Sequence, residues 1–503
     1  MKRASALRNT AHATLATWTE FFLGMLVSIT IARSLEPDTY GHFSFMMWCA
    51  AVFVVFGNGG LTTAIIKFMA ESGLDERGAT YRYLARLQLG ALAAACAIVL
   101  AGAQLQPDFF TATADTSLWL ALLAASALKA SYIFRMSASK GLEDFNAIFK
   151  VVLVVAPANL GAALLVALWQ PSLQNFVLVY LLTCALYLVM MQLVQRHQRP
   201  IAPLSPQLRQ RIWRHLWITS VSIILSFLVL KQSEVFFLRL YASAEDIGFF
   251  NIAFTLGFAL SALFPGVYSA LLLPMMSRQS AGAHGERAQT LHTSVRYLQL
   301  LAWPMVLATQ VLGGALVAVL YGSAYESAAL ALMWVIAGVG IAAVGQAGVS
   351  QLVSSDRQNV VLRINVLVAI AVLAMDWWAI RHWQLSGAAV AFAVGNAVHA
   401  TLMLRLALLS CATRWQWLPT ARTLLAASVP ALVTWPLVIG LDRVGGPLLS
   451  LLLGALCYTL LFIPMTLLCG CWKAGEIDQL HGLAGRLPTP LRVPVRMLLA
   501  VRR

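Results

Sequence analysis

The strongest constraint on this 503-residue chain is a series of apolar windows of about 20 residues each. As an α-helix, such a window crosses the ~30 Å hydrocarbon layer of a bilayer. The chain is 60% hydrophobic and only 11% charged, whereas a soluble protein carries about a quarter charged residues. We therefore predict an all-α polytopic membrane protein with about 14 transmembrane helices. The windows lie at residues 15–33, 41–66, 86–104, 116–134, 149–168, 174–194, 216–238, 247–272, 297–320, 328–352, 363–380, 386–405, 421–441 and 447–470.

The basic residues are distributed unevenly between the two sides of these windows. If the N-terminus is cytoplasmic, 29 of the 35 Lys and Arg residues fall in cytoplasmic segments and 4 on the opposite side. Such an excess over short loops sets membrane orientation. Both termini are therefore predicted to be cytoplasmic. The net charge of +15 follows from topology, and no nucleic-acid partner is predicted.

The motifs of several enzyme classes are absent from the sequence. It contains no GxxxxGK[ST] phosphate loop, no HExxH zinc motif and no DxD pair. The seven cysteines lie in apolar stretches without a CxxC pair, where a cysteine behaves as a small hydrophobic residue. The predicted outer loops are short, which disfavours a membrane polysaccharide polymerase. The sequence predicts a protein that is not an enzyme, with no cofactor and no metal.

Two stretches of the chain share one pattern. In "IARSLEPDTYGHFSF" (31–45), Arg33 is followed by an acidic loop and then Gly41, and in "RLYASAEDIGFFNIAF" (239–254), Arg239 is followed in the same way by Gly248. Six predicted helices separate the stretches, so the two repeats have the same membrane orientation. The pattern predicts an N-terminal lobe at 1–195, a cytoplasmic linker at 196–215, a C-terminal lobe at 216–410, two extra helices at 411–471 and a basic cytoplasmic tail at 472–503.

These segments resemble a known family. The first stretch, followed by "GLTTAIIKFMAE" (60–71), is similar to the N-terminal hallmark of polysaccharide transporters in the multidrug/oligosaccharidyl-lipid/polysaccharide (MOP) exporter superfamily. Glu36 stands where that hallmark usually has Gly. Three further segments resemble later parts of the family, namely "GFFNIAFTLG" (248–257), "YGSAYESAALAL" (321–332) and "GAAVAFAVGNAV" (387–398).

The resemblance implies two six-helix lobes around a central cavity, with two additional C-terminal helices. It implies a protein that flips undecaprenyl-diphosphate-linked oligosaccharide outward across the bacterial inner membrane, for O-antigen, capsule or exopolysaccharide assembly. Membrane lipids, a polysaccharide polymerase and a chain-length regulator are the partners expected beside that substrate. Two alternatives within the superfamily remain open, a peptidoglycan lipid-precursor flippase and a drug/cation antiporter. A membrane polysaccharide polymerase is the alternative of another class.

A diphosphate entering a low-dielectric cavity needs fixed cations, so ionisable residues within the spans are the candidate substrate contacts. Lys129 lies about 9 Å from the predicted cytoplasmic end of its span; it either faces the cavity or extends to that surface. Lys231 and Glu234 are three residues apart and share a helix face. They line the cavity, or they form an internal ion pair.

Three further residues complete the predicted site. Arg33 and Arg239 end their helices on the outer side, where each either contacts phosphate at the exit or anchors the helix end. Glu20 lies near the inner end of the first span. It exchanges a proton or pairs with a cation, or it serves only helix contact. Coupling is accordingly assigned to Glu20 and Glu234.

Overall fold

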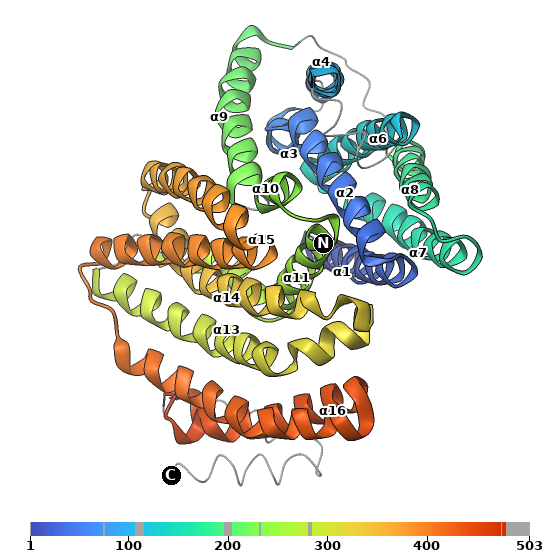
Figure 1. Cartoon of the computed structure of the whole chain (residues 1–503). Helices are drawn as coiled ribbons and strands as arrows, with labels where there is room; N and C mark the ends of the chain where they lie inside the picture. Colours follow the sequence, from blue (N-terminus) through green and yellow to red (C-terminus); the bar gives the residue numbers. More distant parts are fainter. Residues whose placement is uncertain are drawn as a thin grey trace. The chain divides into compact units, whose positions relative to one another are not determined.

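The computed structural model describes residues 2–73, 76–105, 115–195, 204–230, 233–279, 284–473 and 475–478. Every regular element in this part of the chain is a helix (Figure 1). Contacts between residues divide the chain into two compact units, unit 1 (Met1–Gly248) and unit 2 (Phe249–Arg503).

The described part of unit 1 contains nine complete helices and the start of a tenth. They are α1 (Lys2–Ser34), α2 (Pro37–Asn58), α3 (Leu61–Glu71), α4 (Arg77–Leu105), α6 (Thr116–Gly141), α7 (Phe145–Trp169), α8 (Leu173–Val194), α9 (Pro206–Leu230), α10 (Ser233–Tyr241) and the first residues of α11 (Ala244–Leu263). Capping side chains begin two of them: Asp144 accepts a hydrogen bond from the Ala147 amide at the start of α7, and Ser172 accepts one from the Asn175 amide at the start of α8.

Breaker residues set the ends of α2. Pro37 occupies its first position, where a missing amide hydrogen costs nothing because that amide would have no helical partner. At the other end Gly59 has φ +42°, a conformation that favours glycine, and α3 starts after Gly60. The two glycines therefore break the helix within the predicted window 41–66, whose remainder forms most of α3.

The interior of unit 1 combines an apolar core with a polar network. Ile65 and Phe68 of α3 pack with Leu84 of α4, Phe134 of α6 and Ile212 of α9.

In the polar network, the buried Gln88 side chain of α4 donates to Asn58 Oδ1 at 3.1 Å and to the Ala130 carbonyl at 3.0 Å. Asn58 donates to the same carbonyl at 3.1 Å. These bonds satisfy polar groups that lie at the break after α2, where they would otherwise be costly to bury.

Unit 2 continues with long helices. They are the rest of α11, then α12 (Pro265–Gln279), α13 (His284–Tyr321), the 3₁₀ turn η1 (Ser323–Tyr325), α14 (Ser327–Ser354), α15 (Gln358–Ser410) and α16 (Trp417–Leu468). At 1.5 Å per residue, α15 and α16 would each extend about 80 Å if straight, more than twice the thickness of the hydrocarbon layer.

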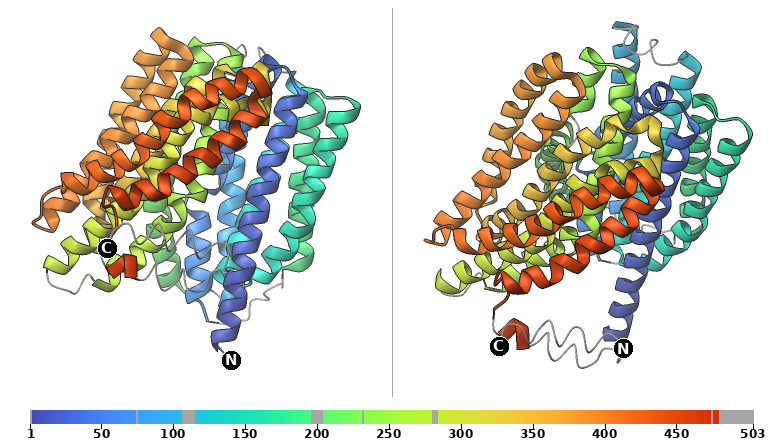
Figure 2. Two further views of the ribbon diagram at one scale, coloured as in Figure 1. Left: turned by 90° about the horizontal axis from the view of Figure 1, so that it is seen from below. Right: turned by 60° about the horizontal axis from the view of Figure 1, so that its bottom comes forward.

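Both of these helices fold back on themselves instead. The backbone of α15 turns at Gln384 (φ +47°), and His399 then contacts Asn365 across the hairpin at 2.9 Å. The backbone of α16 turns at Gly446 (φ +74°), after which Tyr458 donates to the Ala427 carbonyl at 3.1 Å. Figure 2 shows the doubled red α16 as two neighbouring helices. Each element therefore supplies two spans, as the sequence windows predicted.

The fold class predicted from sequence is confirmed: the chain is an all-helical membrane protein. Among the described residues, eleven helices are long and apolar enough to cross a bilayer, and α15 and α16 each count as two. Together α9 and α10 occupy the predicted window 216–238, which brings the spans to the expected fourteen. The division into lobes at 196–215 stays a prediction, because contacts group α9 and α10 with unit 1.

Candidate transport site

The two repeated stretches meet at their glycines. A Cβ atom on Gly41 of α2 would lie 1.8 Å from the carbonyl oxygen of Ala244, and a Cβ on Gly248 would lie 3.2 Å from the Gly41 nitrogen. Only glycine allows the α2 and α11 backbones to approach this closely. This contact joins the two repeated stretches, and the repeat itself stays a prediction.

The second part of the hallmark, residues 60–71, packs against α9. The Gly60 amide donates to the Ser220 hydroxyl at 2.9 Å, and a Cβ on Gly60 would lie 2.2 Å from Thr219 Oγ1. Glu71 forms a salt bridge of 3.0 Å with Arg211. The hallmark residues in α3 thus hold α9 in place and have a structural role.

Arg33 and Arg239 lie in different environments. Arg33 is exposed in the last turn of α1, where a cation interacts favourably with the helix dipole. Arg239 is half-buried on α10, with its guanidinium carbon 5.2 Å from the centroid of the Phe45 ring of α2. That distance is typical of a cation–π contact.

The predicted pair on the seventh span is described only in part. Lys231 lies outside the described residues. Glu234 is 3% exposed in the first turn of α10, where the helix dipole favours a negative charge. Their joint role stays a prediction.

Glu20 and Lys129 are brought together in the middle of unit 1. The two charged groups interact electrostatically between α1 and α6. Glu20 also lies close to Tyr132, whose hydroxyl donates to Met136 Sδ at 3.3 Å and whose ring stacks on Tyr187 with centroids 4.5 Å apart. Lys129 lies close to Tyr180 of α8, with its Nζ 5.2 Å from the centroid of that ring. We call these five residues the Glu20–Lys129 cluster.

The position of Lys129 differs from the sequence estimate. Helix α6 continues to Gly141, so Lys129 lies about 18 Å from the helix end, rather than 9 Å. Its ammonium group contacts Tyr180, fourteen residues before the end of α8. This contact opposes the alternative in which the side chain extends to the cytoplasmic surface.

The exposure of the cluster indicates which kind of environment it faces. Glu20 is exposed on the surface of unit 1, and Lys129 is half-buried. Placing a charged side chain in lipid at mid-span costs several kcal/mol, about 3 on insertion scales. Because Glu20 is charged and exposed at this level, its face of unit 1 is expected to meet water.

Sequence reasoning missed one ionisable residue within a span. Asp376 lies in the first arm of α15 and is fully buried. Its signal was present in the sequence, because it is a carboxylate inside the predicted window 363–380. An in-span carboxylate is a candidate functional residue by the same rule that selected Glu20.

Unit 1 also contains an apolar cavity of about 540 Å³ between α2, α4 and α6. Phe53, Phe56 and Trp119 are among its lining residues. A cavity with this lining suits hydrocarbon and does not suit a diphosphate, whose charge requires polar partners.

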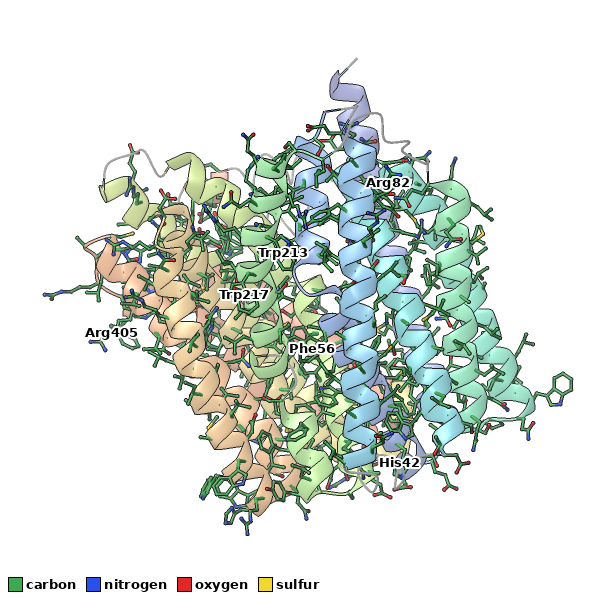
Figure 3. The ribbon with its side chains drawn as sticks, turned by 90° about the horizontal axis from the view of Figure 1, so that it is seen from above. His42, Phe56, Arg82, Trp213, Trp217 and Arg405 are labelled. Carbon is green, nitrogen blue, oxygen red and sulfur yellow. The ribbon has the colours of Figure 1, made fainter. Side chains whose placement is uncertain are left out.

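Two residues mark the opposite ends of unit 1. Figure 3 shows Arg82 of α4 and His42 of α2 at opposite ends of this unit. The charge distribution places Arg82 on the cytoplasmic side and the loop before His42 on the outer side. Which of these two ends faces the cytoplasm stays a prediction.

Comparison with known proteins supplies the family and the fold. A family described as "Polysaccharide biosynthesis protein" matches residues 30–330. No curated protein matches the chain in sequence.

Among solved structures, the lipid II flippase MurJ in an inward closed conformation aligns with a TM-score of 0.70 at 12% identity, covering 90% of this chain and 97% of MurJ. An inward-facing MATE family multidrug resistance transporter of the MOP superfamily aligns with a TM-score of 0.62 at 15% identity, covering 80% and 98%. A mutant of the Vibrio cholerae MATE transporter VcmN gives 0.55 at 17% identity, covering 81% and 97%. The chain therefore has a MOP-like fold.

Proposed function

The chain belongs to the polysaccharide biosynthesis protein family, and from this premise we propose that it flips undecaprenyl-diphosphate-linked oligosaccharide from the cytoplasmic to the periplasmic leaflet of the bacterial inner membrane. Two lobes, 1–195 and 216–410, would alternate in access around a central cavity. The exported oligosaccharide would serve O-antigen, capsule or exopolysaccharide assembly, together with a polymerase and a chain-length regulator.

The Glu20–Lys129 cluster carries this proposal. A diphosphate leaving water needs a fixed cation, and Lys129 supplies one in the middle of a transmembrane unit. The ammonium group already contacts the Tyr180 ring, so less side-chain freedom remains to be lost when phosphate binds. The exposed position of Glu20 next to it leaves the cluster accessible from the surface of unit 1.

Glu20 would allow the cluster to release the bound diphosphate. When the carboxylate is ionised, it attracts Lys129 and competes with phosphate for the same cation. When it takes up a proton, this competition ends and Lys129 is free to bind the diphosphate. Proton exchange at Glu20 would in this way couple to substrate binding and release, with Glu234 as a second candidate for such a role.

The membrane potential favours outward movement of the substrate. An inside-negative potential of 100 mV contributes about 2.3 kcal/mol for each negative charge that moves outward. Two charges on a diphosphate therefore gain about 4.6 kcal/mol. This driving force is available without ATP hydrolysis.

The test is polysaccharide export in a deletion strain that carries variants of the chain. Lys129→Ala should abolish export, and the matched control Lys150→Ala, an exposed lysine on α7, should leave it unchanged. Both are compared at equal amounts of membrane protein. Export by Lys129→Ala at the level of Lys150→Ala would contradict the proposed role.

A charge swap separates binding from a structural role. If the pair only stabilises unit 1, Glu20→Lys/Lys129→Glu should restore both expression and export. If Lys129 itself must meet the phosphate, the swap should restore expression and leave export absent. Full export by the swapped protein would end the substrate-binding role of Lys129.

Purified protein in vesicles distinguishes the remaining substrates. Movement of undecaprenyl-diphosphate oligosaccharide supports the proposal. Movement of a peptidoglycan lipid precursor alone, which the similarity to the MurJ structure makes worth testing, would replace it with the first alternative. Efflux of a cationic drug alone would favour the antiporter, and lengthening of the lipid-linked saccharide would indicate a polymerase.

A further inference from the structure

Unit 2 contains a second cavity, of about 570 Å³, that has no part in the cluster described above. Three segments distant in sequence form its walls: the beginning of α13, the connection between α15 and α16 with the first turns of α16, and the residues after α16. His292 of α13 contacts Thr413 of the connection at 3.0 Å. Arg296 of α13 donates to the carbonyl of Cys471, beyond α16, at 3.0 Å. The walls are therefore joined by direct polar contacts, and the volume suits a small ligand or a lipid head group.

The lining of this cavity is basic. Arg296, Arg422 and Lys473 all line it, and no Asp or Glu does. Glu476 neutralises Arg296 from one side through a salt bridge. Arg422 and Lys473 are exposed and have no ion-pair partner among the described residues. A surplus of two positive charges thus remains at the cavity.

Arg296 shows that this end of the cavity is built around a fixed cation. Its side chain is only 7% exposed. One terminal nitrogen binds the Cys471 carbonyl and the other binds Glu476, whereas the buried Nε has no acceptor among the residues that the structure describes. A buried donor without an acceptor is costly, and an anionic ligand oxygen would satisfy it.

The surroundings place the cavity at a membrane–water boundary. All three walls belong to segments that the charge distribution assigns to the cytoplasm. Trp417, beside the connection, is 75% exposed, and tryptophan collects at the level of the lipid head groups. The lipid phosphates lie at this level, and basic pockets between helices on the cytoplasmic side bind lipid head groups.

We propose that this cavity, lined by Arg296, Arg422 and Lys473, is a binding site for the phosphate of a membrane lipid head group on the cytoplasmic side of unit 2. The ligand chemistry is a phosphodiester or diphosphate on a lipid anchor. Anionic phospholipid and undecaprenyl diphosphate both present it. The site does not depend on the proposed flipping activity, because its charges and volume would bind a resident lipid in any transporter of this fold.

The proposal is tested with the full-length protein in nanodiscs, with bound lipid measured by native mass spectrometry. In phosphatidylcholine nanodiscs doped with phosphatidylglycerol, the wild type should retain the anionic lipid. Arg422→Ala/Lys473→Ala should bind it about 30-fold more weakly, at about fivefold for each cation removed. The matched control Arg357→Ala/Arg405→Ala removes two exposed arginines from other predicted cytoplasmic positions of unit 2 and should bind as the wild type does.

Separate probes identify the source of the phosphate. Undecaprenyl diphosphate in a phosphatidylcholine nanodisc tests the substrate lipid, and inorganic pyrophosphate in the same nanodisc tests a free anion. Preference for phosphatidylglycerol assigns a resident phospholipid, and preference for undecaprenyl diphosphate assigns a substrate entry site. Tightest binding of pyrophosphate would overturn the lipid assignment.

Glu476 supplies a variant with the opposite expected effect. Glu476→Gln keeps the size of the side chain and removes the charge that neutralises Arg296. It should bind each anionic probe about fivefold more tightly. Equal or weaker binding by this variant would overturn the site, as would an equal loss in the control Arg357→Ala/Arg405→Ala. Neither result would bear on flipping, which is measured separately by export.

Discussion

Replacing Gly41 with alanine should separate two helices that now touch. The new Cβ would lie 1.8 Å from the carbonyl oxygen of Ala244, whereas ordinary van der Waals contact begins at 3.4 Å. The contacted atom belongs to the main chain, so no side-chain rotation can relieve the overlap. The backbones of α2 and α11 must therefore move apart.

The loss of folding free energy caused by Gly41→Ala can be bounded with matched variants. Overpacking of this kind costs about 1–3 kcal/mol, occasionally more, and the helix propensity of alanine returns up to about 1 kcal/mol. Gly90→Ala on α4 brings only that gain, because nothing lies within 4 Å of its Cβ. Gly248→Ala, with its nearest contact at 3.2 Å, should fall between the two.

The assay is thermal unfolding of the purified variants in one detergent, with export measured in parallel. We expect the melting temperature to be highest for Gly90→Ala, intermediate for Gly248→Ala and lowest for Gly41→Ala. Export should fall furthest for Gly41→Ala. A melting temperature for Gly41→Ala equal to that of Gly90→Ala would refute the close approach of α2 and α11.

Three further predictions address other parts of the chain. Reporter fusions after Arg33 and after Gln170 should read periplasmic, and a cytoplasmic signal at Gln170 would overturn the topology. Burial raises the pKa of Glu476, but hydrogen bonds from Arg296, Tyr297 and the Lys473 amide outweigh it and hold this pKa below its ordinary 4.5. The ionised carboxylate therefore holds residues 475–478 in place fully above pH 4.5, and this stabilisation is lost as the pH falls through the lowered pKa. Amide hydrogen exchange in residues 475–478 should accelerate in acid. Unchanged exchange would contradict this role of Glu476. Gln88→Leu should cost about 1–3 kcal/mol by leaving the buried Asn58 oxygen without its donor, whereas Gln104→Leu, exposed on the same helix, should unfold as the wild type does.

Most of the fold could be predicted from sequence because its signal is local. A window of apolar residues specifies a span by its own composition, and the hairpin arms of α15 and α16 were found as separate windows for this reason. The break after Asn58 follows from Gly59 and Gly60 and not from hydropathy, because these glycines act on the backbone. The grouping of helices into units depends on contacts between distant segments, which composition does not contain.

The site could be predicted only as separate residues. Lys129 and Glu20 were each selected as a charge inside a span, and nothing in the sequence indicated that α1 and α6 bring them together. The partner Tyr180 carried no signal at all, because a tyrosine in a span is also an ordinary packing residue. The basic cavity of unit 2 could not be predicted from sequence either, because its cations are spread over three segments. Taken one at a time, each cation indicates only which side of the membrane its segment lies on.

The pairing changes what each charge implies. A lone Lys129 in an apolar bundle would lose its proton or extend to the nearest surface, and a lone Glu20 would take one up. Next to each other, the two opposite charges reduce the cost of burying either one. The attraction between Glu20 and Lys129 also opposes the binding of a phosphate to Lys129. A substrate site of this design therefore requires that Glu20 lose its negative charge at one stage of the transport cycle. A cluster that only stabilised unit 1 would have no need to lie exposed on its surface, which is where the structure places Glu20.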